Sequence, residues 1–161
     1  MNIRATSFAF FVLFLPLFAA AQQLQLAGLD GKSVTVTSGD LKSMSRQKVS
    51  VMNGHTKRKE NYEGVLLSDV LAKVDAPAGQ KLHGPALLTY VIAGASDNYQ
   101  VLFSLAEIDQ ATHKNQIIVA DQMNGKAIDD KEGPLKLVVP EDTHPSRSIR
   151  MLTSISLHKA E

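Results

Sequence analysis

The sequence of 161 residues contains no cysteine and no tryptophan. The lack of cysteine excludes disulfides, cysteine nucleophiles, thiolate zinc sites and iron–sulfur clusters. Five of the six phenylalanines lie between Phe8 and Phe18, so beyond that run the chain has only Phe103 and three tyrosines as aromatic residues. The core must therefore consist mainly of Val, Leu, Ile and Met, and few rings are available to stack on bases or sugars.

An excess of one charge sign is lacking as well. The 17 Lys and Arg residues nearly balance the 16 Asp and Glu residues, which gives a formal net charge of +1. No strong electrostatic field is available to attract a polyanion. We therefore expect no nucleic-acid partner.

The N-terminal apolar run, Phe8 to Phe18, is shorter than a membrane-spanning helix requires and is interrupted by Pro16. Small residues follow it at Ala19 and Ala21, in the pattern of a signal-peptidase site. We predict a signal peptide at 1–21 and one mature domain at 22–161, periplasmic or secreted, with no membrane span after cleavage. The alternative is an uncleaved N-terminal anchor.

Short alternating segments dominate the rest of the chain, and they predict more strands than helices. Ser38, Ser68 and Ser104 are predicted helix caps, and Ser104 forms a capping-box pattern with Glu107. The fold class is therefore α+β, a β-rich mixed-sheet domain with short helices. Strands are expected at 24–26, 34–36, 48–52, 87–93, 99–103, 116–120 and 135–139, and the tract 53–61 as a loop or exposed ribbon. Leu152, Ile155 and Leu157 indicate a final strand or a short helix leading into one.

Individual residues also receive structural predictions. Tyr99 and Phe103 alternate on one strand face, and we expect both in the core. Gly64 and Gly133 are expected at turns that need unusual backbone angles.

Three segments carry a resemblance to a known family: Tyr62 to Leu71, Tyr99 to Asp109, and Gly133 to Leu157. In their order and spacing they resemble the short bacterial members of the oxidoreductase molybdopterin-binding domain family. The resemblance runs from about Leu41 to Leu157 and implies the fold of the sulfite oxidase cofactor domain.

The resemblance implies molybdenum held by a cysteine thiolate, which would fall near the segment Met52 to His55. No thiol is present there, and neither a thioether nor an amide supplies the same negative charge. We therefore expect no molybdenum and no oxygen transfer of the sulfite oxidase type. Molybdopterin or a related pterin remains a candidate ligand, because hydrogen bonds recognise a pterin and Arg, Lys or backbone N–H groups recognise its phosphate.

The resemblance also places a pterin-contacting loop after the Val-Val-Pro strand, at 144–150. That loop supplies an imidazole, a hydroxyl and two guanidiniums, although Glu141 and Asp142 before it would repel a phosphate. The alternative is a structural loop. The basic tract 55–59 could also receive an anion, or could be a solvated loop. The predicted cofactor-binding residues are Asn53, His55, His144, Ser146, Arg147 and Arg150.

Metal-binding and catalytic motifs are lacking. No two of the five histidines are three or four positions apart, and no nucleophile elbow, P-loop or dinucleotide motif occurs. We predict no metal ligands and no catalytic residues, and whether the protein is an enzyme stays open.

Three hypotheses follow for function. The first is an exported, non-catalytic binding or accessory module for a pterin-like or anionic small molecule. The second is a molybdenum-dependent oxidoreductase with a non-cysteine ligand, Asn53 or His55. The third is a periplasmic scaffold without a cofactor that binds a partner protein.

Overall fold

A computed structural model describes residues 23–54 and 56–161 of the protein. The predicted signal peptide and the candidate residue His55 lie outside the described residues. Within them, no helix is both long and apolar enough to cross a membrane.

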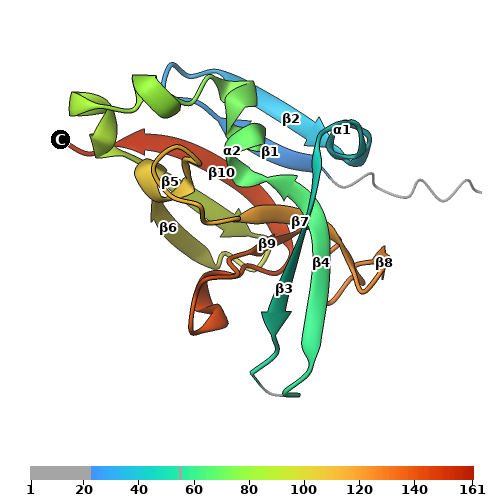
Figure 1. Ribbon diagram of the computed structural model, residues 1–161. Coiled ribbons are helices and arrows are strands. Elements are labelled where there is room, and N and C mark those ends of the chain that lie inside the picture. Colours follow the sequence, from blue (N-terminus) through green and yellow to red (C-terminus); the bar gives the residue numbers. More distant parts are fainter. Residues whose placement is uncertain (1–22, 55) are drawn as a thin grey trace, which may run out of the picture.

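The first of two sheets contains the two ends of the described chain (Figure 1). Its central strand β10 pairs in parallel with β1 and antiparallel with β5, and the outer pairs are antiparallel, so the sheet is mixed. In spatial order its strands are β2 (Ser33–Thr37), β1 (Gln23–Ala27), β10 (Leu152–Lys159), β5 (Thr89–Ala95) and β6 (Gln100–Ser104).

The second sheet is antiparallel, and its β3–β4 hairpin projects from the body of the protein (Figure 1). Strand β9 (Lys136–Val138) pairs with the same residues of β7 as β4 does, and therefore lies on the opposite edge of β7. The other strands follow in the order β3 (Arg46–Met52), β4 (Lys59–Leu66), β7 (Ile118–Met123) and β8 (Lys126–Ala127).

All described helices are short, which confirms the β-rich α+β class. The α-helices are α1 (Ser38–Ser43), α2 (Leu67–Leu71) and α3 (Leu105–Ile108). The 3-10 turns are Ala72–Val74, Gly79–Lys81, Gly84–Leu88 and Pro145–Arg147.

The main hydrophobic core takes side chains from both sheets. Leu26 and Phe103 enter it from the first sheet, and Val119 and Leu137 from the second. A smaller cluster lies within the second sheet, around Tyr62. Aliphatic side chains make up most of the core, as the scarcity of aromatic residues predicts.

The helix caps agree with the sequence only in part. The Ser104 hydroxyl accepts a hydrogen bond from the Glu107 N–H, as predicted, but the Glu107 carboxylate accepts from the Ser104 hydroxyl, where the capping-box pattern predicts the Ser104 N–H. The Ser68 prediction is wrong, because α2 begins at Leu67 and has no side-chain cap. At α1 the cap is Thr37 and not Ser38, and Thr37 forms a capping box with Asp40.

Three further predictions need correction. Tyr99 precedes β6 and is 48% exposed, whereas Phe103 is buried. Gly64 lies inside β4 and not at a turn; a Cβ atom there would stand 2.1 Å from the Val119 carbonyl oxygen. Gly133 packs closely on Ile128, with 2.7 Å from an added Cβ to the nearest atom, and does not have a left-handed φ. At both positions, neighbouring atoms lie too close to leave room for a Cβ atom, which explains the two glycines.

Candidate functional site

The first candidate loop, between β3 and β4, is held by Asn53. Its backbone N–H donates to the Arg58 carbonyl at 2.9 Å. Its side-chain oxygen accepts from the Thr56 N–H at 2.9 Å, and its side-chain nitrogen donates to Glu60 Oε1 at 2.7 Å. The side-chain oxygen and nitrogen of Asn53 therefore both form hydrogen bonds within the hairpin.

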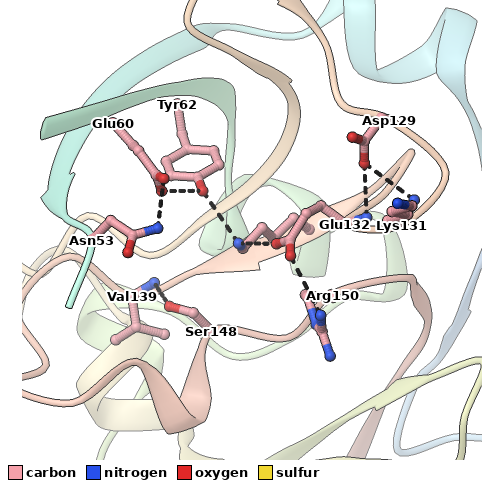
Figure 2. Close-up of polar contacts among 10 residues, drawn as sticks. Asn53, Glu60, Tyr62, Asp129, Lys131, Glu132, Val139, Ser148 and Arg150 are labelled. Atoms are coloured by element: carbon pink, nitrogen blue, oxygen red, sulfur yellow. Dashed lines mark hydrogen bonds and ion pairs between the residues drawn. The ribbon is translucent and has the colours of Figure 1, made fainter. Parts of the chain in front are cut away.

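A chain of side-chain contacts leads from Glu60 to the second candidate loop (Figure 2). The Tyr62 hydroxyl donates to Glu60 Oε2 at 2.9 Å. Lys136 Nζ donates to the Tyr62 hydroxyl oxygen at 3.2 Å and to Glu132 Oε2 at 2.6 Å. The other Glu132 oxygen lies 3.4 Å from Arg150 Nη1. We call these six residues the polar chain: Asn53, Glu60, Tyr62, Lys136, Glu132 and Arg150.

The centre of the polar chain is withdrawn from water. The Lys136 side chain is only 13% exposed, and its ammonium lies 5.1 Å from the centroid of the Tyr62 ring. Burial raises the pKa of Tyr62, and the hydrogen bond to Glu60 and the charges of Glu60 and Glu132 raise it further. Tyr62 therefore stays a neutral phenol that donates one hydrogen bond and accepts another.

Arg147 turns away from the polar chain toward α3. Its guanidinium binds both oxygens of Asp142, at 2.8 and 2.6 Å, and donates to Glu107 Oε1 at 2.6 Å. It also stacks on Phe103, 4.9 Å from the ring centroid. The bonds to Asp142 and Glu107 raise the pKa of Arg147, against the effect of burial. Two carboxylates thus already occupy the groups that a phosphate would use.

Arg150 is the more accessible guanidinium. Its side chain is 55% exposed, and its contact with Glu132 is long for a hydrogen bond. It lines a groove of about 240 Å³ whose wall includes the hydroxyl residues Tyr99, Ser146 and Ser148 and also Asp97. The Tyr99 hydroxyl donates to the Ser146 carbonyl at 2.8 Å, which holds this wall in place.

The predicted site residues therefore separate into groups. Ser146 and Arg150 share the groove, while Asn53 and Arg150 form the two ends of the polar chain. The Arg147 guanidinium is paired with Glu107 of α3, and His144 is exposed just before the 3-10 turn Pro145–Arg147.

The sequence interpretation missed the middle of the polar chain. Tyr62, Glu132 and Lys136 come from β4, from the loop before β9 and from β9. One signal was available: Lys136 stands between Leu135 and Leu137 in an apolar strand, where a lysine needs a buried partner. The identity of that partner depends on tertiary structure.

Comparison with known proteins gives a family and a fold. A model of the family described as oxidoreductase molybdopterin binding domain matches residues 16–161. The chain belongs to this family. In structure it is similar to the sulfane dehydrogenase SoxCD from Paracoccus pantotrophus, with a TM-score of 0.66 at 20% identity. That similarity covers 86% of this chain but 38% of the other, and at this identity it shows the sulfite oxidase-like fold alone. No curated protein matches.

The residues present do not fit a thiolate-held molybdenum centre. The chain has no cysteine, and the sulfur-bearing residue at the end of β3, Met52, is 65% exposed. Across residues 23–54 and 56–161, no group of three or more His, Asp or Glu side chains is arranged to hold a metal.

Proposed function

We propose that this chain is a non-catalytic member of its family and acts, in the periplasm or after secretion, as an accessory binding module. The observation that supports the proposal is the polar chain, in which Asn53 of one candidate loop is linked to Arg150 of the other through four intervening side chains. The pairing of Arg147 with two carboxylates adds to it.

The energetic reason lies in what a cofactor between the loops would displace. A cofactor that entered between Lys136 and its partners Tyr62 and Glu132 would break these contacts, and removing the partners of a poorly exposed charge is strongly destabilising. A phosphate at Arg147 would have to replace the bidentate Asp142 carboxylate, which is itself a strong interaction. Accessory binding requires neither change.

The test uses the full chain expressed in a bacterial host supplied with molybdate, beside a family member that retains the ligand cysteine. Elemental analysis and native mass spectrometry of the purified proteins should find molybdenum at one atom per chain in the control and far less here. Stoichiometric molybdenum or molybdopterin in this chain would overturn the proposal. The mass in the periplasmic fraction should also correspond to residues 22–161, as export with cleavage requires.

The groove at Arg150 favours a second role, binding of a small anionic molecule. Its volume of about 240 Å³ lies below the range of about 300–1,000 Å³ usual for ligand pockets, so it suits a small anion better than a whole molybdopterin. Pterin-6-carboxylate is a suitable probe for calorimetry. Arg150→Gln should weaken its binding about tenfold because a charged hydrogen bond is lost, whereas Lys131→Gln should not. Equal binding by the two variants would exclude this role.

A further inference from the structure

Strand β3 forms an edge of the second sheet and, among the described strands, pairs with β4 alone. The hydrogen bond from the Asn53 N–H to the Arg58 carbonyl shows which residues of β3 form backbone hydrogen bonds with β4, because hydrogen-bonded and non-hydrogen-bonded residue pairs alternate along an antiparallel pair of strands. The backbone N–H and C=O groups of Val49 and Val51 therefore point toward β4. The backbone groups of Lys48, Ser50 and Met52 point away from it, toward the open edge.

The hairpin presents cations at its surface. The Lys48 side chain is 80% exposed beside this edge. At the tip, Lys57, Arg58 and Lys59 are exposed and make no ion pair with any other described residue. The tip lies at the far end of the projecting hairpin (Figure 1).

The nearby carboxylates are engaged within the hairpin and its sheet. Glu60 accepts hydrogen bonds from Asn53 and Tyr62. Glu63 pairs with Arg46 and Lys48. The charge that the hairpin offers to a partner is therefore positive.

The two faces of β3 differ in polarity. Lys48, Ser50 and Met52 are exposed on one face, while Val49 and Val51 belong to the small core cluster on the other. A strand added beside β3 would place its own residues opposite these in alternation. Opposite charges across a strand pair are favourable and like charges unfavourable, so acidic residues suit the lysine face and apolar residues the valine face.

We propose that the edge of β3 and the basic tip of the hairpin dock an extended segment of a partner protein, in which acidic and apolar residues alternate, by strand addition. The proposal rests on the accessory role proposed above and names the chemistry of the partner. Backbone hydrogen bonds at the edge would supply affinity, and the cations would select acidic side chains. Pairing with a second copy of this chain is disfavoured, because it would bring two lysine-bearing edges together.

The probe is a fluorescently labelled peptide of about eight alternating Glu and Val residues, a length that matches one strand. Its binding to the full chain is followed by fluorescence anisotropy. A peptide of alternating Lys and Val is the charge control. The acidic peptide should bind, with affinity that falls as salt is raised, and the basic peptide should not.

Two variants at one position separate strand addition from charge attraction. Ser50→Pro removes an N–H that points to the open edge and leaves the ladder with β4 intact. Ser50→Ala keeps that N–H but loses the hydroxyl bond to Asn61, as proline does too. The proline variant should bind the acidic peptide about tenfold more weakly than the alanine variant. Circular dichroism checks that both remain folded.

A charge-matched pair tests the tip. Lys57→Gln/Arg58→Gln/Lys59→Gln should weaken binding and reduce its salt dependence. Lys42→Gln/Lys81→Gln/Lys131→Gln removes the same charge from exposed sites elsewhere and should do neither.

Two results would overturn the docking proposal: no binding of the acidic peptide, whether or not the basic tip binds anionic phospholipid vesicles, or equal binding of the peptide by the two Ser50 variants. The metal analysis distinguishes this from failure of the accessory role. If the protein contains no molybdenum and does not bind the acidic peptide, only the docking proposal is contradicted. Stoichiometric molybdenum contradicts the accessory role, whether or not the peptide binds.

Discussion

Lys136 is the residue on which the connection between the two candidate loops depends. It donates to Tyr62 on one side and to Glu132 on the other, while its side chain is 13% exposed. A lysine in this position is stabilised by its partners and would be costly without them. The contacts that link the two candidate loops therefore also contribute to the stability of the fold.

We predict that Lys136→Met lowers the free energy of unfolding by about 1–3 kcal/mol. Glu132 would lose its shortest side-chain hydrogen bond, and the Tyr62 hydroxyl oxygen would lose the ammonium that donates to it. Adding Glu132→Gln should recover part of the loss, since the unpaired carboxylate is removed. Urea unfolding followed by circular dichroism measures both variants. Lys131→Met, at an exposed neighbour, is the control and should change stability by less than about 0.5 kcal/mol. Additive losses in the double variant would contradict a direct Lys136–Glu132 coupling.

At the scale of elements, the close contact between β4 and β7 depends on Gly64. The register of the two strands shifts between Glu63 and Gly64, and the Val119 carbonyl lies where a Cβ would be. Because the obstructing atoms belong to backbone, they cannot rotate aside as a side chain could.

Gly64→Ala should therefore destabilise the protein by at least about 1–3 kcal/mol, the usual cost of forcing extra volume into a packed region. Thermal unfolding of this variant measures the loss. Gly54→Ala is the matched control, because a Cβ at Gly54 meets no atom within 4 Å. If the two alanine variants melt at the same temperature, the close approach of β4 and β7 is not a constraint on the fold.

Elements were predictable where their pattern is local. The hairpin of β1 and β2, the turn at Asp97 and Asn98 before β6, and the final strand β10 follow from alternation and turn residues. The start of β4 at Lys59 was less visible, because the polar residues 59–61 take their strand conformation from pairing with β3 and not from their own propensities.

At the scale of the whole molecule, one core joins the two sheets. Leu26 on β1 and Val119 on β7 belong to the same buried cluster although 93 positions separate them in the chain, the difference of their residue numbers. A shared core couples the stability of both sheets, since neither can open without exposing apolar surface of the other.

Leu26→Ala should accordingly cost about 2–5 kcal/mol and lower amide protection in β7 as much as in β1. Hydrogen exchange read by mass spectrometry gives protection for each strand. Leu102→Ala, at a residue 56% exposed on β6, should leave the exchange of β7 unchanged. A loss of protection confined to the first sheet would show that the sheets unfold independently.

The fold class, the family and the lack of a thiolate are all visible in the amino-acid sequence, because strand alternation, turn chemistry and residue identity are local properties. Which charges are paired depends on the folded structure. It directs Arg147 to Asp142 and Glu107, leaves Arg150 on a groove, and places Lys136 between Tyr62 and Glu132. The physical reason is that whether a guanidinium or ammonium can receive a ligand depends on the carboxylates that folding brings beside it from distant parts of the chain.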